Sequence, residues 1–184
     1  MVDTKYFPPV LAYGADNRAI GAGAGITASA DFTPVAAAYG AADIIDVAKE
    51  FAFTFPDGTA VPSGSLIRIL STVVKIDATA VVSGETSYSL PIYSVTPPSA
   101  QADNAAWTLA SVDLPSYRGT LALGTPVDLG AALYVKSQVI DPVTSQPGMD
   151  VKLTGTSLFG RLVTAGAFTA PAVARQIFLY GFVI

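Results

Sequence analysis

Carboxylates are the side chains in this sequence best suited to acid–base chemistry, because the chain contains no histidine and no cysteine. Without either residue, the serines lack the partner of an ordinary nucleophile–base pair. Asp46 and Glu50 lie near each other in the sequence, with Asp43 just before them, and two carboxylates can together cleave a glycosidic bond. On an extended strand, however, Asp46 and Glu50 would lie roughly 13 Å apart. We therefore expect a solvated strand face here and no catalytic residue.

Glycines and aspartates suggest two further kinds of site, neither of which the spacing supports. The run GAGAG, residues 21–25, superficially resembles a phosphate-binding loop, but Ile26 stands where the dinucleotide fingerprint needs a glycine or alanine. Asp141 and Asp150 could contribute to a Ca²⁺ site, yet they lie in no aspartate-rich loop of the calcium-binding type. The sequence thus predicts no nucleotide, no metal and no other cofactor.

Four aromatic residues gather around a long stretch without regular periodicity: Tyr88, Tyr93, Trp107 and Tyr117. Exposed aromatic rings can bind sugars or partner proteins. In a β-sandwich, however, such rings more often cap the hydrophobic core. Both interpretations stay open at this point.

The composition favours a protein that hides much of its surface in an assembly. Of the 184 residues, 51% are hydrophobic and 13% are charged, which is about half the charged fraction of roughly 25% in ordinary domains. Either neighbouring molecules cover the surface, or serine, threonine, glycine and alanine do, and we expect both. The net charge of −4 and the scattered lysines and arginines argue against nucleic-acid binding.

Signals for a membrane or for export are also missing from the sequence. No stretch has the ~18 consecutive apolar residues needed to span a bilayer. The N-terminal sequence MVDTKYFPPV lacks the basic start and apolar core of a signal peptide. We therefore expect no membrane partner, and a soluble protein made and kept in a cytoplasm, or assembled there.

From residue 43 onward the pattern is that of short β-strands separated by turns. In IDVAKEFAFTF, alternation would place five residues on one face: Ile45, Val47, Phe51, Phe53 and Phe55. Further strand-like segments follow: SLIRILSTVVKIDA, SYSLPIYSV, GTPVDLGAALYVKSQVI, MDVKLTG, SLFGRLVTA and QIFLYGFVI. Pro91 in SYSLPIYSV requires a sheet edge or a bulge. These segments predict an all-β fold, a β-sandwich for which we prefer the jelly-roll topology.

Residues 1–42 differ from the rest because they are rich in alanine and glycine and poor in large aliphatic side chains. Alanine buries little area, and glycine weakens both helices and strands. We therefore divide the chain into an extended N-terminal arm, residues 1–42, and a β-sandwich domain, residues 43–184. The arm would lie on another surface; the alternative is a loop over its own domain.

The last strand-like segment is apolar on both faces. One face would carry four large side chains: Phe178, Tyr180, Phe182 and Ile184. The opposite face would carry three more: Ile177, Leu179 and Val183. Each of these side chains is worth ~1.5–3 kcal/mol when it is buried, so neither face should remain in water. We expect the second face to be covered by the chain's own arm or by a neighbouring subunit.

Three longer phrases carry a resemblance to a known family: ATAVVSGETSYSLPIYSVTPPSAQADNAAWTL, YRGTLALGTPVDLGAALYV and VKLTGTSLFGRLVTAGAFTA. They resemble tailed-phage virion proteins thought of as head decoration, or cement, proteins. The resemblance covers residues 43–184, about three quarters of the chain, and is weaker in residues 1–42. It implies a jelly-roll-like protein that forms trimers on the outside of an icosahedral capsid and clamps neighbouring capsid subunits. It implies no catalytic residue.

Together these observations predict a structural virion protein that is not an enzyme, forms a homotrimer and binds the major capsid protein. It would lie on the outer surface of the capsid, assembled in the host cytoplasm. We expect contact between subunits at Phe178, Tyr180, Phe182 and Ile184. We expect contact with the capsid through the arm, at Tyr6, Phe7, Tyr13 and Phe32, unless these side chains pack onto their own domain.

Two other hypotheses belong to different classes of protein. The chain could be a receptor- or glycan-binding module of a phage fibre or spike, in which Trp107, Tyr93 and Tyr117 line the binding surface. It could instead be a hydrolase that uses a carboxylate pair, in which case mutation of Asp46 or Glu50 would abolish glycosidase activity; we expect none.

Overall fold

The structure is a computed structural model that describes residues 12–13, 19–20, 24–35 and 37–184. Antiparallel strands dominate these residues, and their one helical element is a short 3₁₀ turn, η1 (Ser111–Asp113). Two main sheets pack face to face around a common core. The prediction of an all-β sandwich is therefore confirmed.

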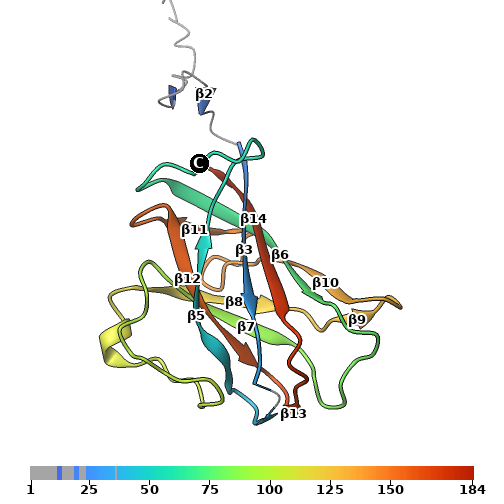
Figure 1. The fold of residues 1–184 in the computed structure, drawn as a ribbon. Helices are drawn as coiled ribbons and strands as arrows, with labels where there is room; N and C mark the ends of the chain where they lie inside the picture. Colours follow the sequence, from blue (N-terminus) through green and yellow to red (C-terminus); the bar gives the residue numbers. More distant parts are fainter. Residues whose placement is uncertain (1–11, 14–18, 21–23, 36) are drawn as a thin grey trace, which may run out of the picture.

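The larger sheet contains the first and the last long strands of the described chain, side by side. Its strand order is β3 (Gly25–Phe32), β14 (Arg175–Val183), β6 (Leu66–Ile76), β10 (Leu133–Gln138) and β9 (Val127–Asp128), and β11 (Met149–Lys152) also pairs with β6. Figure 1 shows β14, in red, between β3 in blue and β6 in green. The end of β14 is fixed by hydrogen bonds from the Val183 N–H to the Ala24 carbonyl (3.2 Å) and from the Ile184 N–H to the Leu66 carbonyl (2.9 Å).

The smaller sheet has the order β5 (Ile44–Ala52), β12 (Ser157–Thr164), β7 (Tyr88–Tyr93) and β8 (Tyr117–Leu123). Pro91 lies in β7 between two neighbours, opposite Arg161, where the pairing of β7 with β12 is interrupted. A proline cannot donate a ladder hydrogen bond, so this interruption accommodates it. Two short pairs complete the fold: β1 (Ala12–Tyr13) with β2 (Ala19–Ile20), and β4 (Ala38–Tyr39) with β13 (Phe168–Thr169).

Strand β5 departs from the predicted alternation at Asp46. This residue has a φ of 65°, and the pairing of β5 with β12 shifts register beside it. Ile45 lies in the core between the sheets, Ile44 is buried as well, and Val47 is 52% exposed. Phe51 and Phe53 are buried as predicted, but Val47 lies in a bulge, where three residues of β5 stand opposite one residue of β12, and it therefore leaves the buried row.

The predicted boundary between arm and domain also differs from the structure. Residues 25–32 form strand β3 of the larger sheet and pair with β14 along their whole length. Their side chains alternate, with Ile26, Ala28 and Phe32 buried. The second half of the predicted arm is therefore part of the sandwich.

Candidate functional site

The outer face of the larger sheet carries a row of aromatic side chains from β14. Ile177 and Leu179 point into the core and are fully buried, so alternation turns Phe178, Tyr180 and Phe182 outward. The rings of Phe178 and Tyr180 stack, with their centroids 6.5 Å apart and their planes 18° apart. The structure thus brings together three of the four residues predicted for subunit contact.

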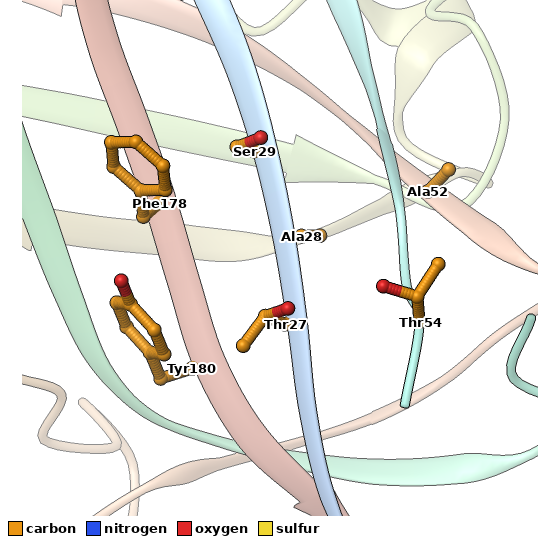
Figure 2. Close-up of a pocket in the computed structure, with 7 residues that line it drawn as sticks. All are labelled: Thr27, Ala28, Ser29, Ala52, Thr54, Phe178 and Tyr180. Atoms are coloured by element: carbon orange, nitrogen blue, oxygen red, sulfur yellow. The ribbon is translucent and has the colours of Figure 1, made fainter. Parts of the chain in front are cut away.

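A pocket of about 350 Å³ opens beside these two rings. Figure 2 shows its lining, which comes from three neighbouring strand segments: Phe178 and Tyr180 of β14, Thr27, Ala28 and Ser29 of β3, and Ala52 and Thr54 at the end of β5. Thr27 and Thr54 exchange two backbone hydrogen bonds of 2.9 Å, which fix the two strands together at this point. We call this pocket the aromatic groove.

Apolar side chains continue beyond the groove toward the end of β14. Ile184, the fourth residue predicted for subunit contact, is 38% exposed, and Leu66 and Leu70 of β6 are also exposed. Leu70 is the extra residue at a bulge, where the pairing of β14 with β6 shifts between Tyr180 and Gly181. We call the groove together with these exposed side chains the open face. Its rings and hydroxyl groups suit noncovalent contact with a partner.

The outer face of the smaller sheet is covered by the chain itself. Residues 94–116, which we call the long loop, are held there by Arg161 of β12 and Asp113, both almost fully buried. The Asp113 carboxylate lies 3.7 Å from Arg161 Nη1 and accepts a 2.8 Å hydrogen bond from the Ser99 N–H. Arg161 also donates to the Ser99 carbonyl. A buried charge pair thus anchors the loop.

Three of the four aromatic residues singled out in the sequence meet between this loop and the sheet, whereas Tyr88 lies in the core between the sheets. Tyr93 is fully buried; its ring lies 5.7 Å from that of Tyr117, and its hydroxyl accepts a 3.3 Å hydrogen bond from Trp107 Nε1. Burial raises the pKa of Tyr93, and the Arg161 guanidinium lies 5.7 Å from its ring. These side chains therefore join loop to sheet. A sugar-binding platform built on Tyr93 is not available in this arrangement.

The residues predicted for capsid contact are placed only in part. Tyr6 and Phe7 lie outside the described residues, and for Tyr13, in β1, only the backbone is described. Phe32 is fully buried, and its ring lies 6.2 Å from that of Phe51. The prediction for Phe32 is therefore wrong: it occupies an inward position of β3 and packs onto its own domain.

The carboxylates near the start of β5 serve the local structure. Burial would raise the pKa of Asp46, but hydrogen bonds from the Thr33 and Val47 N–H groups and the Lys49 ammonium outweigh it and lower the pKa. Glu50 accepts a 2.6 Å hydrogen bond from Ser157 Oγ. Within the described ranges, no group of three or more metal-binding side chains comes together.

A second buried ion pair lies near the start of β14, and sequence reasoning missed it. Arg175 Nη2 lies 2.7 Å from Glu85 Oε1, and both side chains are almost fully buried. Arg175 Nη1 also donates to the carbonyl groups of Pro171 (3.1 Å) and Val173 (2.6 Å). Tyr88 donates to Glu85, and burial raises the pKa of this tyrosine. The cluster joins β14 to the turns at one end of the sandwich.

Among the residues that the structure places, no helix is long and apolar enough to cross a bilayer. No family model matches the chain, and no curated protein matches it either.

Proposed function

We propose that this protein is a structural component of a phage virion, which assembles as a homotrimer and decorates the outside of the capsid in contact with the major capsid protein. The open face carries this proposal. Tyr180, Ile184, Leu66 and Leu70 are each 37–43% exposed there, next to a groove lined by two aromatic rings. Exposed apolar side chains gathered on one face mark interaction sites; the ion pair of Arg68 with Asp150 lies among them.

Burial of the open face would supply the free energy of assembly. A large apolar side chain contributes ~1.5–3 kcal/mol when its exposed surface is buried completely, and aromatic residues dominate the energetics of interfaces. The low charged fraction of 13% suits a chain whose surface is covered by neighbours. In a closed ring of identical subunits, every copy can cover the same surface of the next one.

The strand order supports a jelly roll as the finer topology. If the eight long strands β3, β5, β6, β7, β8, β10, β12 and β14 are numbered one to eight, the sheets read 1-8-3-6 and 2-7-4-5. The chain thus crosses between the sheets repeatedly, and its first strand pairs with its last. Jelly rolls combine two such four-stranded sheets, and viral capsid domains use them.

The mode of action follows from mass action. A protein that binds an assembled shell more tightly than its separate subunits stabilises the shell, by an amount that rises with the logarithm of its concentration above Kd. Many copies with modest individual affinity would add up over a capsid. The resemblance of residues 43–184 to phage decoration proteins agrees with this mode of action.

A receptor- or glycan-binding module is the weaker hypothesis. Of the aromatic residues that would line its site, Trp107 and Tyr117 each contact Tyr93, which is buried between the long loop and the sheet. No platform of three exposed rings remains for a sugar to stack on.

The proposal is tested by the mass of the purified chain in solution and by capsid stability. We expect a particle of three times 18.9 kDa that binds undecorated capsids, and capsids lacking it should burst at lower temperature or under milder osmotic shock. A monomer that does not bind capsids contradicts the proposal. Intact heads with lost adsorption to host cells would instead favour the receptor-binding hypothesis.

A further inference from the structure

The long loop presents two apolar side chains at the turn η1. Val112 is 60% exposed and Leu114 is 55% exposed, while Asp113 between them is fully buried. The turn is held in shape, since the Asp113 N–H donates to the Ala110 carbonyl (2.9 Å) and Ser116 Oγ donates to the Asp113 carbonyl (2.9 Å). We call Val112 and Leu114 the knob. Because it is already ordered, the knob would lose little conformational entropy on binding.

The knob and the aromatic groove lie on different surfaces of the molecule. The groove lies on β14, β3 and the end of β5, whereas the knob belongs to the loop that covers the smaller sheet. Figure 1 shows the short helical turn, in yellow, at one side of the molecule, well separated from β14 and β3. The groove combines two aromatic rings and two alanines with the hydroxyl groups of Thr27, Ser29 and Thr54. A chain with a protruding apolar element on one surface and such a recess on another can bind copies of itself.

The charges near the two surfaces are opposite. Arg118 is exposed beside the knob, with its Nη1 atom 3.0 Å from the Pro115 carbonyl. Asp31 is exposed on β3, two residues after Ser29 of the groove. Residues two apart on a strand share a face and lie about 7 Å from each other, so Asp31 borders the groove. An arginine beside the knob and a carboxylate beside the groove would attract each other.

We propose that the knob of one copy enters the aromatic groove of the next copy, with Arg118 of the first facing Asp31 of the second. This inference rests on the proposed trimer and names the contact that builds it. The occupant is a second copy, because the chain itself supplies the knob, the groove and the opposite charges beside them. Since the contact joins two different surfaces, it is head-to-tail and can close into a ring.

The first experiment separates this contact from one in which two open faces pack against each other. One variant combines Val112→Asp and Leu114→Asp; a second carries Thr27→Glu in the groove; a control carries Val143→Asp at a side chain that is 89% exposed. We expect the first two to be monomers at concentrations where the wild type and the control are trimers. Mixing the two defective variants should give dimers, because one intact knob then meets one intact groove.

The second experiment tests the charges. Arg118→Glu and Asp31→Arg should each weaken assembly at least tenfold, and the double variant should recover most of the loss, because the pair is restored with its signs exchanged. A knob variant that remains trimeric, or a mixture that stays monomeric, overturns the head-to-tail contact and leaves the proposed function intact. A monomeric wild type overturns both.

Discussion

The outer faces of the two sheets differ in what covers them. On the smaller sheet, residues 94–116 lie over the strands, and the buried pair of Arg161 and Asp113 holds them in place. On the larger sheet, the described residues leave Tyr180, Leu66 and Leu70 exposed beside the aromatic groove. The same sandwich therefore has one face that its own chain closes and one face that the described residues leave open.

The chemistry of the two faces explains the difference. A loop that lies on a sheet brings polar backbone groups with it, and these must find hydrogen-bond partners. Arg161 and Asp113 supply such partners at Ser99. The open face has aromatic rings, aliphatic side chains and short hydroxyl side chains, which suit contact with the surface of another molecule. The pair of Arg161 and Asp113 thus marks the face that the chain closes by itself.

Removal of the Asp113 carboxylate, which holds the long loop together with Arg161, should lower the free energy of unfolding of the isolated subunit more than any other substitution below. In an Asp113→Ala variant, Arg161 would remain buried without its carboxylate, and breaking a buried pair costs about 3–5 kcal/mol. Urea unfolding should show this loss, and hydrogen exchange should accelerate in residues 94–116. Asp113→Asn, which keeps the shape and one acceptor, serves as the matched control and should lose less. Unchanged stability of the Ala variant would mean that the loop does not depend on this pair.

A methyl group at Gly181 should cause the next largest loss of free energy of unfolding. A Cβ atom there would overlap the backbone carbonyl of Arg68, whereas a Cβ at Gly25 on the neighbouring strand would meet nothing within 4 Å. We expect Gly181→Ala to lower the free energy of unfolding by about 1–3 kcal/mol, as overpacking does. Gly25→Ala should leave it unchanged or raise it. Equal stability of the two variants would contradict the close approach of β14 and β6 at the open face.

Alkaline pH should weaken the closed face. Burial raises the pKa of Tyr39 to about 12, and its hydroxyl donates a 2.9 Å hydrogen bond to Asp103 of the long loop. In the unfolded chain the pKa is about 10, so the folded state favours the neutral phenol. This contribution is complete below pH 10 and is lost as the pH rises through 12.

Unfolding by urea between pH 9 and pH 12 would measure this dependence. In Tyr39→Phe the free energy of unfolding should fall less steeply with pH, although other buried tyrosines, such as Tyr88 and Tyr93, still contribute. The same slope in the wild type and in this variant would show that Tyr39 does not titrate between pH 10 and pH 12.

Substitution of an exposed residue on the open face should change the free energy of unfolding of the isolated subunit least. Ser29 is exposed on β3, and surface substitutions usually change stability by no more than about 0.5 kcal/mol. Ser29→Lys should therefore leave the unfolding of the isolated subunit nearly unchanged while it reduces assembly. Urea unfolding combined with solution mass would separate the two effects. A large loss of stability would mean that this part of the groove belongs to the fold itself.

The sequence predicted the strands with strong alternation and missed features that depend on tertiary contacts. QIFLYGFVI correctly separated the buried Ile177 and Leu179 from the outward aromatic side chains. Alternation in ITASADF, residues 26–32, could also have identified β3, but its small side chains hid it among alanines and glycines. The bulge at Asp46 was missed because one residue with a positive φ leaves no clear pattern.

The contacts of the two buried arginines could not be predicted from local sequence. Arg161 meets Ser99, 62 residues away, and Arg175 meets Glu85, 90 residues away. Either arginine alone reads as an ordinary charged residue. The groove likewise combines β14, β3 and the end of β5, which only the fold brings together.

The position of β14 also has a consequence for the order in which the molecule folds. Strand β3 pairs on one side with β14 along its whole length, and about 150 residues separate the two strands in sequence. Topologies with such high contact order fold slowly, because a long stretch of chain must be closed before the pairing stabilises it. Until β14 inserts, the β3 and β6 edges that it joins stay unpaired and prone to aggregation. Refolding yield should therefore depend on how quickly this one strand reaches its place.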